Sequence, residues 1–336
     1  MTPRQVVLEQ IYHRETDRVP YTLAFEEEVG ARIDRHFGGD AWRGQLIPYI
    51  THCGSVAGSP NQELDATHYR DAFGTIWRTD ELPPVVAEPG LAAPSFQGYD
   101  FPSADRFLDA DAKKEAIRRI DECPDSFAIV STGLCLWQSW YVRGFETTLM
   151  DVALEETFYT ELLDRLTDLT LDLIEACVDV PADAIMMGDD WGDQRGVMIG
   201  PERWRRLFKP RYTRIFEAIH EQGKLAIMHC CGSTADIQAD IIETGLDVLE
   251  SVQPEAGGMN PYGLKEAWGD QMTYWGCLGS QYTVPFAAAP EVREEIRHLR
   301  SEMSRGGGYI MAPAKPLRTE TPTENAVAVV EEFLAG

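Results

Sequence analysis

Residues 223–233 read GKLAIMHCCGS, and this stretch decides the fold of the chain. Its centre, Leu225–His229, is a short apolar run between two longer segments with helical periodicity. A short strand-like run that alternates with helical segments is typical of a βαβ unit in a parallel sheet. The stretch therefore predicts one strand of a parallel α/β fold, ending in His229, Cys230 and Cys231.

The same pattern recurs on both sides of this stretch. Further candidate strands are Phe127–Ser131, Ala184–Gly188, 247–252, 272–276 and 309–312. The longest helical segment, 155–178, has apolar residues at spacings of three and four, which indicates one buried face. Those residues are Phe158, Leu162, Leu166, Leu169, Leu173 and Cys177. Two more strands, expected at 21–25 and 46–52, would complete a (β/α)8 TIM barrel.

The region 54–124 lacks this regularity and is rich in Pro and Gly. We interpret it as an N-terminal elaboration, inserted so that it caps the mouth of the barrel. A chain of 336 residues is an ordinary length for one elaborated barrel, so residues 1–336 are predicted to form a single domain.

Composition narrows the function classes. The formal net charge is −25, from 30 basic and 55 acidic residues, and such a surface repels nucleic acid and anionic membranes. An odd number of cysteines, seven, with two adjacent, indicates reduced thiols and a cytoplasmic protein. No secretory signal or apolar run of about 20 residues is present, so a membrane segment is not expected. The oligomeric state is left open.

His229 and Cys231 are the first candidate metal ligands. Side chains alternate along a strand, so these two share one face and Cys230 points to the other. Functional side chains of a barrel gather where strands end, and an imidazole with a thiolate suits Zn²⁺. The alternative is a core histidine beside buried thiols.

Two adjacent strands carry further candidate ligands. Glu250 is a carboxylate within an apolar strand, which is costly unless the charge is paired or bound to a metal. Cys277 ends the following strand. We expect Glu250 as a third ligand and Cys277 as a fourth; a salt-bridged Glu250 and a packed Cys277 are the alternatives.

Other candidate residues follow other strands. Asp189 and Asp190 are assigned catalytic roles, in substrate positioning or proton transfer, with helix capping as the alternative. The candidate substrate-binding residues are Trp137, Gln138, Trp191, Gln194 and Gln281. Trp191 would stack on a planar group, and the aromatic residues near 137–140 would line an apolar pocket.

These motifs, in this order, resemble the uroporphyrinogen decarboxylase superfamily, and specifically its corrinoid-dependent methyltransferase branch. The match runs over most of the chain. The motifs that carry it are RVP at 18–20, YRDAFGTIWR at 69–78, DDWGDQ at 189–194, MIGP at 198–201, FKPRY at 208–212, HCCGS at 229–233, DVLESVQP at 247–254, GGGYIMAP at 306–313 and TPTEN at 321–325.

This chain departs from the decarboxylase pattern at one place and from the methyltransferase pattern at another. Decarboxylases of the family are metal-free and carry an arginine-rich motif near the N-terminus, whereas this chain reads YTLAFEEEVGARID after Pro20. The methyltransferases hold zinc with a His-x-Cys pair and a later cysteine after the last strand. Here that turn reads APAKP, with Lys315 near the expected position. Related methionine synthases use a Glu on the strand after the pair, which supports Glu250 in that role.

The resemblance implies a zinc-dependent methyltransferase. It would move a methyl group between a small substrate (a methyl ether, a methylated amine or alcohol, or a thiol) and a corrinoid (cobalamin) carried by a partner protein. O-demethylation, with Lys315 beside a developing phenolate, is one form. The carrier motif Asp-x-His-x-x-Gly is absent, so the corrinoid protein would be separate. Two alternatives remain: a metal-free decarboxylase that depends on Asp189, and a non-catalytic ligand-binding barrel.

Overall fold

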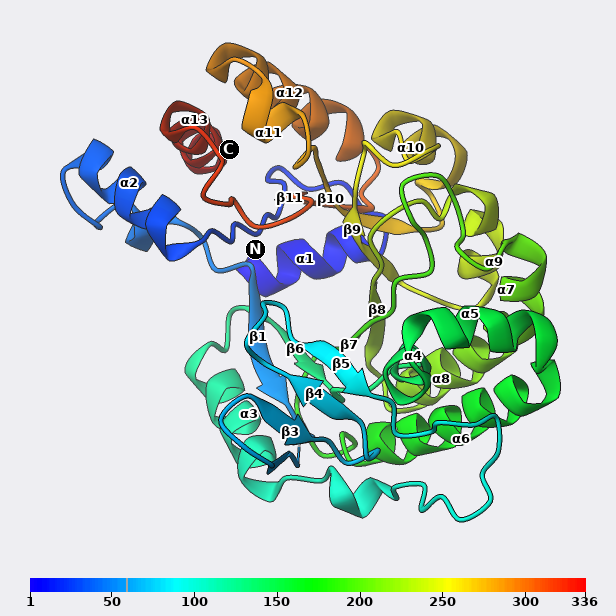
Figure 1. Cartoon of the computed structure of the whole chain (residues 1–336). Helices are drawn as coiled ribbons and strands as arrows, with labels where there is room; N and C mark the ends of the chain where they lie inside the picture. Colours follow the sequence, from blue (N-terminus) through cyan, green and yellow to red (C-terminus); the bar gives the residue numbers. More distant parts are fainter. Residues whose placement is uncertain (59) are drawn as a thin grey trace.

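Seven parallel strands form a strongly curved sheet at the centre of the molecule (Figure 1). The computed structural model describes residues 1–58 and 60–336. In sheet order the strands are β1 (Ile50–Ser55), β6 (Phe127–Ser131), β7 (Ala184–Gly188), β8 (Leu225–His229), β9 (Val248–Val252), β10 (Thr273–Leu278) and β11 (Tyr309–Pro313). Every neighbouring pair is parallel. The six strands predicted from residue 127 onward are confirmed.

The two N-terminal strand predictions fare differently. The strand expected at 46–52 begins only at Ile50, because Pro48 has no amide hydrogen to donate to a neighbouring strand. The segment 21–25 forms isolated parallel bridges, Tyr21 with Met311 and Phe25 with Leu317, and is not a continuous strand. It lies beside β11, since the Thr22 amide donates to the Met311 carbonyl at 2.9 Å. The described sheet is thus a seven-stranded, barrel-like parallel sheet.

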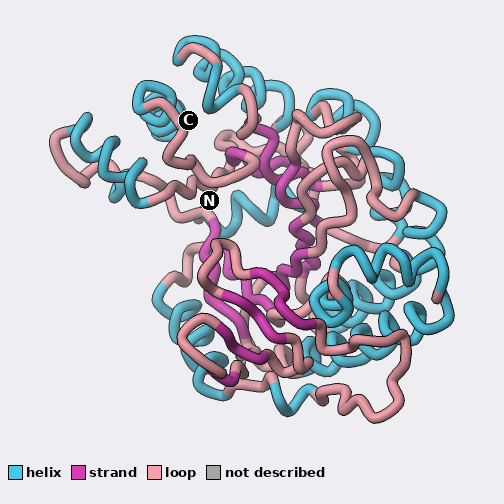
Figure 2. The backbone as a smooth tube through the Cα atoms, in the orientation of Figure 1, coloured by secondary structure: helices cyan, strands magenta, loops and turns pink. Residues whose placement is uncertain are grey.

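Helices surround this sheet on its outer side (Figure 2). Among the longer helices are α6 (Glu156–Glu175), α8 (Lys209–Glu221), α12 (Ala289–Met303) and α13 (Thr323–Ala335). Smaller ones are α2 (Glu27–Phe37), α4 (Gln138–Arg143), α5 (Phe145–Leu154), α7 (Pro201–Leu207), α9 (Gln238–Glu243), α10 (Pro261–Trp268) and α11 (Thr283–Phe286). The apolar face predicted for α6 is buried as expected. Among the described residues, no helix combines the length and apolar character needed to cross a membrane.

Helix α1 (Pro3–Ile11) covers the amino ends of the strands. It begins at a capping box in which Thr2 and Gln5 satisfy each other's main-chain amides. The Gln10 carbonyl accepts the Gly308 amide at 2.7 Å, just before β11 begins. The Arg4 side chain forms an ion pair of 2.6 Å with Asp183, just before β7. These contacts close one end of the barrel-like sheet.

The region 54–124 is more ordered than its sequence indicates. It contains a four-stranded antiparallel sheet made of β2 (Gln62–Glu63), β3 (His68–Arg70), β4 (Ile76–Arg78) and β5 (Val85–Glu88). Helix α3 (Ala110–Glu122) then packs against β1. Strands this short carry too few residues for a recognisable alternation, which is why the sequence reads as irregular. The Leu91 amide donates to the Val142 carbonyl at 2.9 Å, so the inserted sheet is tied to the end of α4.

Candidate active site at the carboxyl ends of the strands

Three potential metal ligands converge where β7 and β8 end. One ligand atom from each of Asp190, His229 and Cys231 lies within 4.8 Å of the others, and all three residues are half-buried. The Cys231 thiol and the Cys231 amide both lie 3.1 Å from the same oxygen of Asp190. The structure thus joins the predicted His-x-Cys pair to a carboxylate that the sequence assigned to catalysis.

Two glycines let the loops after β7 and β8 approach closely enough to form this group. A Cβ on Gly192 would lie 2.1 Å from the Ser233 carbonyl oxygen, and one on Gly232 would lie 2.4 Å from that of Gly192. Gly232 also has φ of +81°, a conformation that favours glycine. Main-chain bonds then tie the loops together, with the Ser233 amide donating to the Asp193 carbonyl at 2.7 Å.

Glu250 does not belong to this group of three. It lies opposite His229 in the register of β8 and β9, and its carboxylate is hydrogen-bonded to Nδ1 of His229. The role of Glu250 as a direct ligand stays a prediction, and the contact with His229 offers a second role. A carboxylate on the second nitrogen of a ligating histidine fixes the orientation and tautomer of the ring, and leaves Nε2 for the metal.

The electrostatics of His229 follow from these neighbours. Burial disfavours the charged imidazolium, but hydrogen bonds to Cys231 and Glu250, together with the charge of Glu250, outweigh it. They raise the pKa of His229 to about 10. The charge of Lys315 acts in the opposite direction. Without a metal, this histidine therefore carries a proton near neutrality, and metal binding would displace that proton.

The chemistry of the donor set fits zinc. Imidazole nitrogen, thiolate sulfur and carboxylate oxygen are the three donor types that Zn²⁺ takes in proteins. Asp190, His229 and Cys231 supply one of each, and three protein ligands leave a position for substrate, as in catalytic zinc sites.

Cys277 is absent from this group within the described residues, and its role as a fourth ligand stays a prediction. The register of β9 and β10 shifts after Trp275, and both Gly276 and Cys277 have positive φ, at 122° and 73°. Strand alternation is interrupted there. The Cys277 thiol is buried, and burial, together with the charge of Glu295 on α12, raises its pKa.

Asp189 and Trp191 lie behind the group of three. Asp189 is 2% exposed and accepts hydrogen bonds from the Tyr212 hydroxyl and from Nε1 of Trp191, the latter at 3.2 Å. Burial raises the pKa of Asp189 to about 7, although these hydrogen bonds oppose the shift. The Trp191 ring packs edge-on against Trp204 and Tyr212, and its amide donates to the Cys230 sulfur. Trp191 is therefore buried in packing here, and its role as a stacking surface for a substrate stays a prediction.

The other predicted substrate-binding residues are spread over the molecule. Trp137 packs on Trp140, and Gln138 lines a small separate cavity under the inserted sheet. Gln194 and Gln281 are exposed, and the Gln281 amide donates to Glu255 at 2.8 Å. None of the four lines the cavity beside His229, so the structure does not place them with the group of three.

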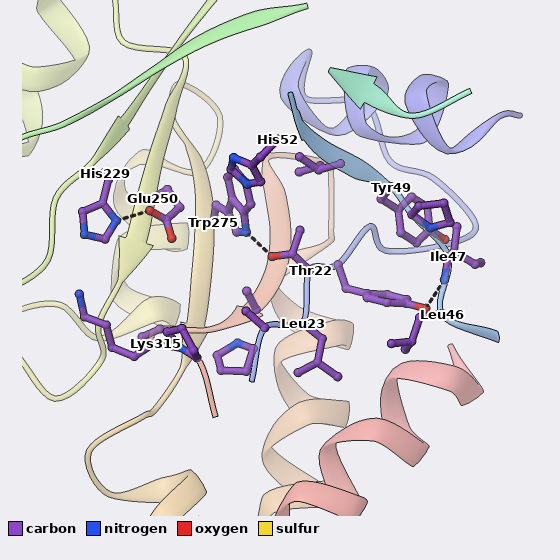
Figure 3. A pocket seen from close by; sticks show the side chains of 18 of the residues that line it. Thr22, Leu23, Leu46, Ile47, Tyr49, His52, His229, Glu250, Trp275 and Lys315 are labelled. Atoms are coloured by element: carbon purple, nitrogen blue, oxygen red, sulfur yellow. Dashed lines mark hydrogen bonds and ion pairs between the residues drawn. The ribbon is translucent and has the colours of Figure 1, made fainter. Parts of the chain in front are cut away.

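A cavity of about 620 Å³ opens beside His229 and Glu250 (Figure 3). Lys315 stands at the same end of the cavity. The other end is lined mainly by apolar side chains, with Arg43 also in its lining, and lies between the segment 21–25 and the residues that precede β1. Its lining there includes Leu23, Leu46, Ile47 and Tyr49. The cavity therefore has a polar end at the candidate metal site and an apolar end away from it.

Two cavity residues, His52 on β1 and Trp275 on β10, were missed in the sequence. Their rings stack with centroids 6.0 Å apart and planes inclined by 28°. Nε1 of Trp275 donates to the Thr22 hydroxyl at 2.9 Å, which fixes the indole. His52 sits within a predicted strand, so a polar side chain at the end of that strand was the available signal.

A curved parallel sheet with polar side chains and a cavity at the carboxyl ends of its strands defines a class of protein: an α/β barrel-like enzyme fold. The family model of uroporphyrinogen decarboxylase (URO-D) matches residues 76–334. The chain belongs to that family.

Two curated relatives illustrate the range of this family. The chain is 24% identical over 179 residues to a uroporphyrinogen decarboxylase of Thermus thermophilus, covering 53% of this chain and 48% of that protein. It is also 24% identical over 175 residues to methylcobamide:CoM methyltransferase MtaA of Methanosarcina barkeri, covering 51% and 47%. The chain thus spans about half the length of the curated relatives it matches.

Among solved structures, a methyltransferase from Methanosarcina mazei is similar over nearly the whole chain. The TM-score is 0.70 at 18% identity, with 99% of this chain and 98% of that chain covered. At this identity the likeness shows a shared fold.

Proposed function

We propose that this protein is a zinc-dependent methyltransferase that moves a methyl group between a small organic substrate and a corrinoid protein. The observation that carries the proposal is the convergence of Asp190, His229 and Cys231 beside a cavity large enough for a substrate. A decarboxylase without a metal would leave this set of nitrogen, sulfur and oxygen donors without a role.

The ligand set in this proposal is Asp190, His229 and Cys231. Zinc, when bound there, would supply a Lewis acid for the oxygen or sulfur that carries the methyl group. Glu250 orients His229 through Nδ1, so it is a positioning residue. Asp189 holds Tyr212 and Trp191 behind the loop that carries Asp190, and thereby positions that ligand.

Lys315 has a separate role in the proposal. In the part of the chain that the structure describes, its ammonium has no ion-pair or hydrogen-bond partner, and its charge is felt by His229. An unpaired cation beside the site stabilises negative charge on the substrate heteroatom when the methyl group departs. Lys315 thus acts on the substrate and is not a substitute for a metal-binding cysteine.

The corrinoid would come from a partner protein that docks at the open, carboxyl end of the strands. The Methanosarcina barkeri relative, whose name describes transfer from a methylcobamide, supports this choice of partner. We further propose that the segment 21–25 acts as the eighth wall of a (β/α)8 barrel and that the inserted sheet borders its mouth. Both features would confine the substrate between the barrel and the docked partner.

The test combines metal analysis with a transfer assay. Purified protein should contain about one zinc per chain, and His229→Ala and Cys231→Ala should lose it. Cys123→Ala, which changes a cysteine outside the site, is the matched control. The assay measures demethylation of methylcobalamin, through its absorbance change, with a simple thiol as methyl acceptor, and only the zinc-containing proteins should be active.

Two outcomes would contradict the proposal. Equal, near-zero zinc in all four proteins would remove the metal. Release of CO₂ from uroporphyrinogen by protein that contains no zinc would establish the decarboxylase instead, since the family includes such enzymes.

A further inference from the structure

The shape of the cavity carries an inference about the substrate, and this inference rests on the proposed function. Ligand pockets in proteins commonly have volumes of about 300–1,000 Å³, and about 150 Å³ suffices for a benzene ring. The cavity beside His229, at about 620 Å³, therefore has room for a ring with substituents. A one-carbon alcohol would leave most of it unfilled.

The two ends of the cavity set an orientation for such a molecule. Lys315, Glu250 and His229 lie together at one end, and Leu46 and Ile47 lie at the other (Figure 3). A substrate whose methyl-bearing heteroatom faces His229 would place its apolar body toward Leu46 and Ile47. Burial of apolar surface there would favour binding.

His52 lies between these two ends, on the wall formed with Trp275 (Figure 3). The Thr22 hydroxyl holds the Trp275 ring, and Trp275 backs the imidazole of His52. Within the described part of the chain, neither ring nitrogen of His52 has a hydrogen-bond partner in the protein. The His52 side chain is exposed, and the protein packed around it lowers its pKa, so the neutral ring offers one donor and one acceptor.

We propose that the substrate is a methyl compound with an apolar body of ring size and a hydrogen-bonding substituent, and that His52 binds this substituent and determines specificity. The stacked pair of His52 and Trp275 forms the wall against which the apolar body lies. The hydrogen bond to His52 then selects among ring-sized methyl compounds.

Calorimetric titration with three probes tests this inference without any turnover. The probes are methanol, anisole and 2-methoxyphenol, which add first a ring and then a hydroxyl beside the methyl ether. Anisole should bind at least about ten-fold more tightly than methanol, because the ring fills the apolar end. The additional hydroxyl should improve binding about five- to ten-fold, the worth of one hydrogen bond.

Three variants assign these effects to residues. His52→Ala should remove the advantage of 2-methoxyphenol over anisole, and His52→Asn should restore part of it, because an amide also donates and accepts. His36→Ala, on the exposed face of α2, is the matched control and should keep the wild-type ratios. Ile47→Trp should lower the ratio of anisole to methanol affinity by filling the apolar end.

Failure of this inference is distinguishable from failure of the proposed function. Equal affinity for methanol and anisole, no measurable binding of any probe, or an unchanged 2-methoxyphenol advantage in a folded His52→Ala would overturn it. Absence of zinc and of methyl transfer, with the affinity ratios intact, would instead reject the methyltransferase and leave a binding site of the inferred selectivity.

Discussion

At the amino ends of the strands, Asp183 and Asp247 each accept the main-chain amide of a neighbouring strand and pair with a basic side chain. Asp183 accepts the Ala128 amide at 2.9 Å and pairs with Arg4; Asp247 accepts the Ala226 amide at 2.7 Å and pairs with His220.

At the carboxyl ends of the strands, by contrast, several polar side chains are not paired in this way. There, among the described residues, Lys315 and the ring nitrogens of His52 have no hydrogen-bond or ion-pair partner in the protein, and Asp190, His229 and Cys231 lie close together beside a cavity. The comparison teaches that polar groups at one end stabilise the fold, whereas those at the other end are left available for a ligand. Substitutions at the two ends should therefore separate stability from activity.

The largest expected effect comes from a pair of aspartates, one from each end. Asp190→Ala removes a proposed metal ligand and should lower methyl transfer at least about 1,000-fold, because metal-assisted catalysis supplies several kcal/mol. It should lose only about 1 kcal/mol of stability, because the half-buried Cys231 amide loses its acceptor. Asp183→Ala should instead lose about 2 kcal/mol of stability, because the Ala128 amide and Arg4 lose their acceptor. This variant should keep its zinc. Denaturant titration and the transfer assay measure both.

The next effect concerns the close approach of the loops after β7 and β8. Gly232→Ala combines a positive φ with a Cβ that would lie 2.4 Å from the Gly192 carbonyl oxygen, so we expect a loss of about 3 kcal/mol together with loss of zinc. Gly38→Ala is the matched control, since φ there is +73° but nothing lies within 4 Å of the added Cβ. It should cost only about 1 kcal/mol. Equal losses in the two variants would show that the loop contact contributes nothing.

Glu250→Gln should produce an intermediate effect. The amide keeps the shape of the carboxylate but holds the imidazole less strongly, and loss of such a partner typically lowers metal affinity about 10- to 100-fold. Competition for zinc with a chelator measures this change, and Glu243→Gln, exposed on α9, is the control. A larger loss, equal to that of His229→Ala, would indicate that Glu250 is itself a ligand.

The smallest effect is a pH dependence at the amino ends. The hydrogen bond to Asp247 raises the pKa of His220 above 6.5, although burial opposes this. The stabilising contribution of the protonated histidine is thus fully present below pH 6.5 and is lost as pH rises through the folded-state pKa. His220→Gln should destabilise the protein more at pH 6 than at pH 9, by less than about 1 kcal/mol because the pair is partly exposed. Chemical denaturation at the two pH values compares the variant with the wild type, and a difference that is the same at both would contradict this assignment.

Much of the fold could be read from the sequence because its patterns are local. The six strands from residue 127 onward and the apolar face of α6 appear as predicted. The N-terminal third was harder to read, since Pro48 delays β1 and the strands β2–β5 span only two to four residues each. Periodicity alone predicts the fold class but not the family. The order of the sequence motifs predicted the uroporphyrinogen decarboxylase family, and the match of the family model to residues 76–334 confirms it.

The residues of the candidate site also differ in how far the local sequence could predict them. Alternation along a strand predicted that His229 and Cys231 lie together, and their ligand atoms do lie within 4.8 Å, although β8 ends at His229 and Cys231 stands in the loop that follows. The roles of Asp190 and Glu250 depend on how the neighbouring strands and loops meet, which the two glycines determine. The irregularity at Trp275 and Gly276, which interrupts the alternation before Cys277, has a local signal in Gly276, because a glycine inside a strand often marks a bulge.

The sequence by itself determined a parallel α/β fold, one imidazole and thiolate on a common face, and a family. These are properties of residues close together in the chain. Only the tertiary structure brought the Asp190 carboxylate beside His229 and Cys231, left Lys315 without an ion pair among the described residues, and placed His52 and Ile47 in one cavity with His229. The physical reason is distance along the chain: β1 and β8 are separated by more than half of the sequence, and only closure of the sheet brings their ends to one space.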